Sequence, residues 1–566
     1  MKRKLIGIIS SFCLILVLAG VPFISACEPA VPTGELVILL TTMGGEVWGP
    51  DVGGGLDDNI KEITNEMLVI APIEGQEPRV QPMLAERWEM SADGLTWDFY
   101  LRQGIQFNDG WGEFTAEDVL YSAQIYTREG TTGSYAPGFR VGEGMESYEI
   151  VSPYHIRFHL TKPQPEMEYH LCETNFGEIS KKYYEAVGFD YAIMHPIGTS
   201  PWRLIEHKPA EYVKYEAVEN HWRQTPEFKY LTIKEVPELS TQLAMLKTGV
   251  ADFAEVPIEF AAEMEAVGFQ TKRREGGGSA HLLLGGQVLP TREGYDPTCP
   301  WVTHQDEAEA LADHEAGWGK VTGGSEWNQR ALKVRMAMLY AINADAIIDN
   351  IFYGEGGKVP IGAAGGWASL GSVWLRPEWK LLPYDSELAK QLLIEAGYPD
   401  GFEIRFTIFA TGQQPRLEEI AEAVARDWEA IGLTVKREMT EYAVERPIWG
   451  ARGNVDAVTL RVWPAPPEPW GDVDYCYSTT NEAYNDGYES LELDAMSLKC
   501  STTVDYDERL EATLEMGDFL YARYIGPSIV LTNAVYALSP EVEDIPVGIS
   551  PFEYRLGWFE YATRAD

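Results

Sequence analysis

The most informative pattern of hydrophobic and polar residues lies between positions 81 and 126. Apolar side chains occupy every second position from Leu95 to Leu101, which is the period of a strand with one buried face. Asp93-Gly94 directly before this run is a strong signal for a hairpin turn, and Asn108-Asp109-Gly110 after it indicates a second turn. The segment therefore predicts a hairpin followed by a turn.

A capped helix is predicted after the second turn. Thr115 stands three residues before Asp118, so its hydroxyl can cap the first turn while the carboxylate lies near the positive end of the helix dipole. One face of this helix carries Val119, Ser122, Ala123 and Tyr126.

Helices and strands alternate in the later part of the chain. A helix that starts at 383–386 ends at Gly397, and residues 402–408 alternate as a strand. A second helix over 417–431 stops at Gly432 before a strand over 433–439. This order favours a largely parallel sheet. Further strands are predicted at 36–42, 231–236 and 529–536, and further helices at 60–68, 179–187, 240–247, 334–342 and 507–524.

The length of 566 residues, 45% of them hydrophobic, allows more than one core and predicts at least two domains. The first 27 residues differ from the rest, because Lys2, Arg3 and Lys4 precede an apolar run that ends near Cys27. That order predicts an export signal. These residues could instead form a membrane anchor that is not cleaved, or an ordinary signal that is cleaved without further modification. No later stretch has the length and apolarity of a membrane span.

The chain is strongly acidic. Without the signal it has 42 basic against 87 acidic residues, a net charge of −45. Nucleic acid is therefore excluded as an expected partner, and the charge is explained most simply by a solvated surface.

Four cysteines lie beyond the signal, namely Cys172, Cys299, Cys476 and Cys500. Outside the cytoplasm such thiols can be oxidised. A disulfide between Cys476 and Cys500 is favoured because both flank one loop-rich segment, although four cysteines allow three connectivities.

Signatures of catalysis are missing from the sequence. It has no G-x-S-x-G elbow, no H-E-x-x-H, no P-loop and no paired-cysteine metal motif. His304 and His314 lie among acidic residues in an insertion over 291–328, but their spacing matches no metal-ligand motif, so a solvated surface insertion is the favoured interpretation. We expect no enzyme activity, no metal and no cofactor.

The string over 81–126 resembles the signature of family 5 extracytoplasmic solute-binding proteins, the dipeptide-, oligopeptide- and nickel-binding components of ABC importers. Further matches follow in the family's order at 196–204, 248–253, 334–342 and 384–402. The resemblance implies an α/β, two-lobed periplasmic-binding-protein-like fold of the large class, with mixed sheets flanked by helices, an extra subdomain and a hinge between the lobes.

The expected domains follow from this resemblance. They are a lipoprotein signal at 1–27, a tether at 28–35, lobe I at 36–290 with the extra subdomain at about 57–195, the acidic insertion at 291–328, lobe II at 329–525, and a return to lobe I at 526–566. Residues 24–27 resemble a bacterial lipobox, which implies that Cys27 is lipidated.

The ligand site is expected in the second lobe at residues 461–470. This segment aligns with a family segment in which an aspartate pairs with the α-ammonium of a peptide, but Pro466 stands at or next to that position and Glu468 replaces a later aspartate. Arg461 is a candidate for a ligand carboxylate and Trp463 for stacking. A strand residue and a structural tryptophan are equally good interpretations. Weaker candidates are Trp48 and Asp51 in the first lobe, and Trp367 and Trp374 in the second.

The resemblance implies a receptor that closes its lobes around a peptide or other small organic solute and delivers it to an ABC permease. It would be a monomer outside the cytoplasm, anchored to the membrane by lipid. An exported hydrolase and a surface sensing lipoprotein that use the same fold are the alternatives.

Overall fold

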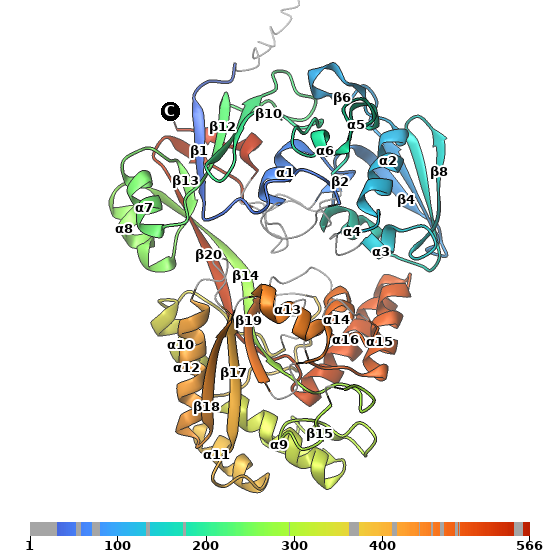
Figure 1. The fold of residues 1–566 in the computed structure, drawn as a ribbon. Coiled ribbons are helices and arrows are strands. Elements are labelled where there is room, and N and C mark those ends of the chain that lie inside the picture. The colour runs from blue at the N-terminus through green and yellow to red at the C-terminus, as the bar shows by residue number, and fades with distance from the viewer. Residues whose placement is uncertain are drawn as a thin grey trace, which may run out of the picture.

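The computed structural model shows two lobes, one above the other, joined by strands (Figure 1). It describes residues 31–51, 58–70, 80–131, 136–173, 177–293, 295–361, 373–409, 416–440, 442–453, 457–463, 469–480, 485, 487–547 and 558–565. Among the helices in these ranges, none combines the length and hydrophobicity that a transmembrane span needs.

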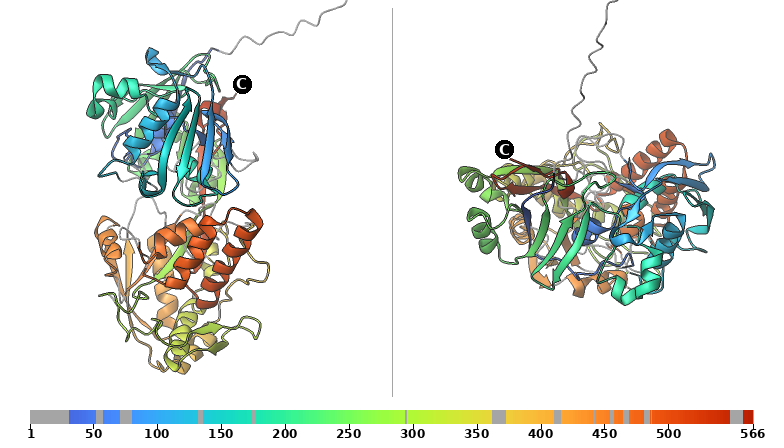
Figure 2. Two further views of the ribbon diagram at one scale, coloured as in Figure 1. Left: turned by 90° about the vertical axis from the view of Figure 1, so that its right-hand side faces the viewer. Right: turned by 90° about the horizontal axis from the view of Figure 1, so that it is seen from above.

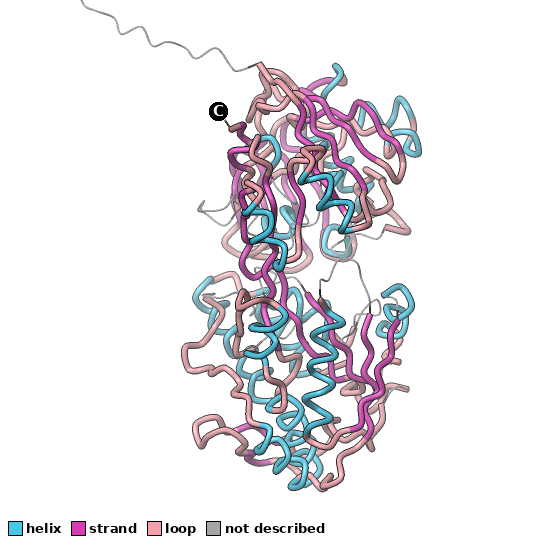
Figure 3. Tube along the Cα trace, turned by 90° about the vertical axis from the view of Figure 1, so that its left-hand side faces the viewer, coloured by secondary structure: helices cyan, strands magenta, loops and turns pink. Residues whose placement is uncertain are grey.

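One ten-stranded mixed sheet runs through both lobes in the order β10-β11-β12-β1-β13-β20-β14-β19-β17-β18. The strands β14 (Gln270–Leu284) and β20 (Ser528–Leu538) are long enough to belong to both lobes, and they pass between them side by side (Figure 3). The first-lobe strands are β10 (Trp202–Lys208), β11 (Tyr212–Ala217), β12 (Tyr230–Glu235), β1 (Glu35–Leu40) and β13 (Phe253–Glu255). The second-lobe strands are β19 (Ala457–Trp463), β17 (Glu403–Phe409) and β18 (Thr434–Thr440).

The first lobe packs its core between this sheet and short flanking elements. β1 runs parallel to both β12 and β13, and its alternate residues Leu36 and Ile38 are fully buried. The chain returns here at its other end, since Phe559 and Ala562 lie in the same core. The flanking elements are α1 (Asp58–Thr64), α7 (Leu239–Lys247), α8 (Ala261–Ala266), β21 (Val542–Asp544) and β22 (Thr563–Arg564).

A separate four-stranded antiparallel sheet, in the order β4-β5-β9-β8, forms the extra subdomain. Its strands are β4 (Ala85–Met90), β5 (Thr96–Leu101), β9 (His155–Leu160) and β8 (Met145–Ser152). The predicted alternation is confirmed, because Trp97, Phe99 and Leu101 are buried while the residues between them are partly exposed. The smaller strands are β2 (Val69–Ile70), β3 (Gln81–Pro82), β6 (Gln106–Phe107) and β7 (Gly112–Glu113), and the helices are α2 (Ala116–Tyr126), α3 (Ala136–Phe139), α4 (Met167–Glu173), α5 (Lys181–Val187) and α6 (Phe189–Ala192).

The predicted helix cap at Thr115 is also confirmed as a capping box at the start of α2. The backbone N–H of Thr115 donates to Asp118 Oδ2 at 2.9 Å, and the Thr115 hydroxyl donates to the same oxygen at 3.1 Å. The predicted inner face, with Val119 and Tyr126, is fully buried against the sheet. The start of α2 and its buried face were thus predicted correctly from residues close together in the sequence.

The second lobe has the predicted parallel strands. β17 pairs in parallel with β18 on one side and with β19 on the other. Gly397 and Gly432 follow the helices before these strands with φ of +88° and +99°, a backbone region that favours glycine. The helices are α9 (Glu326–Tyr340), α10 (Ala344–Ile351), α11 (Ser386–Glu395), α12 (Leu417–Ala430), α13 (Tyr442–Gly450), α14 (Pro469–Tyr477), α15 (Leu491–Thr502) and α16 (Tyr506–Arg523).

The insertion over 291–328 differs from the predicted solvated surface segment. Cys299, Trp301 and Val302 are buried in the second-lobe core, and the insertion adds a small hairpin of β15 (Ala310–Ala312) and β16 (Val321–Gly323). Buried Arg335 of α9 donates to Trp301 O at 2.7 Å and to Arg523 O at 3.0 Å. Burial lowers the Arg335 pKa to about 10. The apolar residues of the insertion, rather than its acidic ones, decide its position.

Candidate functional site

The junction between the lobes is made of the paired strands β14 and β20. Their register shifts between Arg274 and Gly278, and Glu275, Gly276 and Gly277 lie between these two paired residues. Glycine has no Cβ and rotates more freely about its backbone bonds than other residues. Just below the shift, the hydroxyls of Ser279 and Ser528 lie 2.8 Å apart, within hydrogen-bond distance. The two lobes are therefore joined by a continuous sheet, and the glycines of β14 allow the twist of that strand to change at the junction.

The sequence-predicted ligand segment begins at this junction. In β19, Trp463 pairs with Ser279 of β14 and Arg461 pairs with His281, which is fully buried. The backbones of Arg461 and Trp463 are thus placed beside the crossing strands, while their side chains, together with Glu468 and Trp367, lie outside what the structure describes. The roles of these four residues stay predictions.

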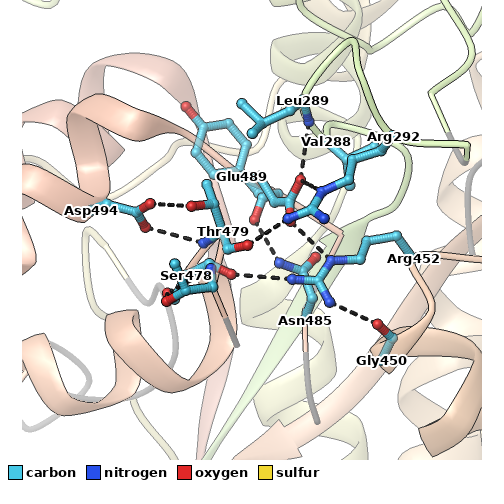
Figure 4. Close-up of polar contacts among 12 residues, drawn as sticks. Val288, Leu289, Arg292, Gly450, Arg452, Ser478, Thr479, Asn485, Glu489 and Asp494 are labelled. Atoms are coloured by element: carbon cyan, nitrogen blue, oxygen red, sulfur yellow. Dashed lines mark hydrogen bonds and ion pairs between the residues drawn. The ribbon is translucent and has the colours of Figure 1, made fainter. Parts of the chain in front are cut away.

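A buried polar cluster holds the chain on both sides of that segment (Figure 4). Glu489 is fully buried and accepts hydrogen bonds from two guanidinium groups, those of Arg292 at 2.9 and 3.0 Å and of Arg452 at 2.9 Å. The Leu289 N–H donates to the same carboxylate at 3.1 Å. We call Glu489, Arg292 and Arg452 the Glu489 clamp.

The Glu489 clamp reaches both ends of the segment that contains β19 and α14. Before β19, Arg452 donates to Gly450 O at 2.7 Å; after α14, it donates to Ser478 O at 3.3 Å. Thr479 is fixed in addition, because its backbone N–H donates to Asp494 Oδ1 at 3.1 Å. Arg452 adopts a left-handed backbone with φ of +56°, which is rare for a residue with a side chain. The clamp thus fixes the two attachment points of the candidate ligand segment.

The sequence did not identify this clamp. Its members lie up to 197 residues apart, as in the pair of Arg292 and Glu489. A glutamate and two arginines in loops resemble ordinary surface residues, and only the fold shows that Glu489 is buried.

Trp48 and Trp374, two of the predicted ligand residues, lie in hydrophobic cores. Trp48 is fully buried in the first lobe, and its indole N–H donates to Ile60 O at 3.2 Å. Trp374 is 2% exposed in the second-lobe core, with its ring centroid 6.4 Å from that of Tyr506. Both positions have a structural explanation that requires no ligand.

Asp51, the third candidate that the structure describes, is also buried and forms an ion pair with Arg128, with 2.5 Å between Oδ2 and Nη2. Its backbone oxygen accepts from the Thr131 hydroxyl at 3.0 Å. Arg128 in turn stacks on Phe189, with 3.7 Å from Cζ to the ring centroid. Asp51 thus joins the loop after β1 to the residues that follow α2, and Arg128 in turn contacts α6.

The predicted disulfide between Cys476 and Cys500 is absent. Both residues are buried where α14 and α15 pack, but Cys500 is a free thiol. Burial raises its pKa to about 11, and a hydrogen bond with Thr513 of α16 opposes that rise. The prediction failed because the Cys500 side chain contacts α16, which proximity along the sequence does not reveal.

The two histidines of the insertion are engaged in aromatic packing. His304 stacks on Trp327 with centroids 4.5 Å apart, and His314 stacks on Tyr521 at 4.1 Å. Within the described part of the chain, no group of three His, Cys, Asp or Glu side chains is arranged to hold a metal ion.

Glu178 in the extra subdomain is a buried acid that sequence reasoning missed. It is fully buried, and neither carboxyl oxygen has a hydrogen-bond partner among the described residues. The nearby Ser122 hydroxyl already donates its hydrogen to Asp118 O at 2.8 Å, so it can only accept another. Burial, helped by the charge of Asp118, raises the Glu178 pKa to about 8. Burial thus favours the protonated, neutral form of this side chain at pH 7.

Comparison with known families agrees with this geometry. Residues 79–484 match the family described as "Bacterial extracellular solute-binding proteins, family 5 Middle". The chain belongs to this family. The matched stretch includes the extra subdomain, most of the first lobe, β14, β17 to β19 and α14. The predicted family is confirmed, and it is a family of binding proteins.

Individual relatives are distant. The chain is 27% identical over 388 residues to "Heme-binding protein A" of Haemophilus influenzae, covering 64% of this chain and 62% of that protein. It is 26% identical over 381 residues to the "Dipeptide-binding protein" of Escherichia coli, covering 63% of each. The matched regions thus span less than two thirds of these relatives.

Solved structures show the same fold over nearly the whole chain. The periplasmic binding protein DppA of Helicobacter pylori, in complex with the peptide STSA, superposes with a TM-score of 0.72 at 21% identity, covering 93% of this chain and 98% of that one. The substrate-binding protein CtaP of Listeria monocytogenes gives a TM-score of 0.75 at 18% identity, covering 95% and 100%. The predicted two-lobed fold is confirmed.

Proposed function

We propose that this protein is an extracytoplasmic receptor that captures a peptide or another small organic solute by lobe closure and delivers it to an ABC transporter permease. The observation that carries the proposal is the family match over residues 79–484, in a chain whose two lobes are joined by β14 and β20. A solute that contacts both lobes favours the closed arrangement, because its differential affinity shifts the population.

Native mass spectrometry of the protein purified without denaturation tests this function. A copurified small molecule that raises the thermal midpoint when added back supports a receptor, since a ligand stabilises the state that binds it. Conversion of that molecule by the purified protein would instead favour an exported hydrolase. Absence of any stabilising solute in a broad library would favour a sensing lipoprotein.

The ligand class is proposed from relatives and from the segment at 461–470. By their names, relatives bind heme, dipeptides and glutathione. Arg461 is proposed to contact a ligand carboxylate and Trp463 to stack on the ligand. Because Pro466 stands at or next to the position where peptide binders of the family have their aspartate, we propose a ligand without a buried ammonium group.

Di- and tripeptides with a free amine should therefore bind poorly in calorimetry. Replacing Pro466 with aspartate should strengthen their binding by about 10- to 100-fold, the effect of a charge-assisted hydrogen bond of about 1.5–3 kcal/mol. N-acetylated forms of the same peptides are the matched control and should gain nothing. Tight binding of free-amine peptides by the unaltered protein would refute the proposal.

Membrane attachment is proposed through lipid on Cys27, which lies outside the described residues. Cys27→Ala should release the protein from membranes, as measured by membrane fractionation, and should remove the diacylglycerol mass that mass spectrometry is expected to find on the unaltered protein. Cys172→Ala is the control, because that residue is buried in the fold. A membrane-bound Cys27→Ala protein that retains residues 1–27 would show an uncleaved anchor instead.

A further inference from the structure

The lobes contact each other away from the crossing strands, between the extra subdomain and the second lobe. The subdomain lies directly above α15 and α16 (Figure 2, left). Glu166, which precedes α4, forms an ion pair with Arg509 of α16, and these side chains are only 7% and 6% exposed. The two residues are 343 positions apart in sequence. This buried pair therefore joins the lobes at a point that the main sheet does not reach.

Arg509 is oriented by its own lobe. Its Nη1 donates to Thr503 O at 2.8 Å and to Val504 O at 3.1 Å, both in the turn between α15 and α16. The guanidinium is thereby held in place, and its other terminal nitrogen, Nη2, contacts Glu166. A preoriented group loses little side-chain entropy when it forms the contact.

The hairpin turn of the extra subdomain reaches the same turn of the second lobe. Gly94 has φ of +70°, and a Cβ placed on it would lie 2.7 Å from Val504 Cγ2 and 3.0 Å from Pro163 Cβ. Gly94 is connected to the Glu166 segment, since the Gln164 N–H donates to Gly94 O at 3.3 Å. The Asp93-Gly94 turn, which the sequence marks as a hairpin, is therefore also an interlobe contact.

The strength of such a contact depends on the arrangement of the lobes. A buried ion pair loses its hydration, which offsets much of the attraction between the charges. When the lobes separate, both charged groups are hydrated again, and this hydration offsets part of the lost attraction. The ion pair therefore favours the arrangement in which the lobes touch but still allows them to open. The contact is consequently suited to reversible closure.

We propose that Glu166, Arg509 and the Gly94 turn form a latch that sets the balance between closed and open lobes. The Gly276-Gly277-Gly278 region of β14 provides the flexible connection, and the latch provides the opposing contact at the other end of the lobe interface. The latch acts on the lobes themselves and does not depend on which solute the protein takes.

Small-angle X-ray scattering of charge-swapped variants tests the latch. Glu166→Arg alone and Arg509→Glu alone place like charges together and should increase the radius of gyration by about 1 Å or more, from the roughly 24 Å expected for a compact chain of this size. The double variant Glu166→Arg with Arg509→Glu should return it to the original value. Each protein is dialysed out of urea first to remove bound molecules, and no solute is added.

Two further variants keep the test decisive. Glu166→Gln removes the charge without repulsion, so it replaces Glu166→Arg if that protein fails to fold, and should give a smaller increase in the same direction. Arg376→Gln breaks ion pairs with Asp518 and Glu511 that lie within the second lobe, and should leave the radius unchanged.

An unchanged radius of gyration in the folded Glu166 and Arg509 variants would overturn the latch, even if their thermal midpoints fall, because a purely structural ion pair predicts that pattern. This outcome is separate from failure of the proposed function, which would appear as the absence of any bound solute. If the charge-swapped variants expand as expected and no solute binds, the latch is supported and the proposed receptor role is refuted.

Discussion

Replacing Glu489 with alanine should lower the free energy of unfolding by about 3–5 kcal/mol, the usual effect of removing one partner from a buried ion pair. The guanidinium of Arg452, only 6% exposed, would lose its carboxylate, and the Leu289 N–H would lose its acceptor. Urea denaturation followed by tryptophan fluorescence measures the change as a lower midpoint.

The control for this prediction is Glu387→Ala. Glu387 pairs with Lys390 on the surface of α11 at 3.0 Å and is 83% exposed, so its loss should change stability by less than about 1 kcal/mol. Because the Glu489 clamp fixes both sides of β19 and α14, Glu489→Ala should also weaken solute binding. Equal midpoints for Glu489→Ala and Glu387→Ala would show that the clamp contributes no stability.

Replacing Glu178 with glutamine should stabilise the protein increasingly as the pH rises. The folded pKa of about 8 lies above the ordinary glutamate pKa of 4.5, so between these two pH values the folded protein holds a proton that the unfolded chain has released. Stability therefore falls with rising pH between these two values. Glutamine carries no ionisable proton and avoids this loss, so its advantage should grow by about 3–4 kcal/mol between pH 5 and pH 8.

The measurement is the thermal midpoint of both proteins across that pH range. Glu185→Gln on the exposed surface of α5 is the control and should follow the unaltered protein at every pH. If the midpoints of Glu178→Gln and the unaltered protein stay parallel from pH 5 to pH 8, then Glu178 does not carry a buried proton.

Features that depend on neighbouring residues could be predicted from the sequence. The capping box at Thr115, the alternating strand through Phe99 and the glycine-ended helix before β18 each depend on residues within a few positions. Such local preferences agree with the final fold in these places. The order of helices and strands likewise sufficed for the parallel arrangement of β17 and β18.

Features that depend on distant residues could not be predicted. Trp48 was a ligand candidate because the family resemblance places its loop at the cleft, and its burial in the first-lobe core, in contact with Ile60 and His207, follows only from the fold. The pair of Glu166 and Arg509 requires two lobes to meet, and no pattern in either segment points to the other. Burial of a polar group is a property of the assembled core, so the sequence does not reveal it.

The interpretation of the insertion failed for a related reason. Its composition is dominated by charge, whereas its position depends on buried residues such as Trp301 and Val302 and on the hydrogen bonds of Arg335, which lies outside it. The strand β19 places the backbones of the ligand candidates Arg461 and Trp463 at the lobe junction, and their roles in binding stay predictions.

The path of the chain has a consequence for biosynthesis. The second lobe lies between β14 and β20 as one uninterrupted stretch, whereas the first lobe needs both Leu36 and Phe559 in its core. Since a chain emerges from its N-terminus, most of the lower lobe can condense while the upper one still lacks its last strands. The first lobe must keep its apolar surface exposed until its last strands are made. Chaperones that hold unfolded chains should therefore bind the first lobe rather than the second lobe, which is synthesised later but can complete its folding sooner.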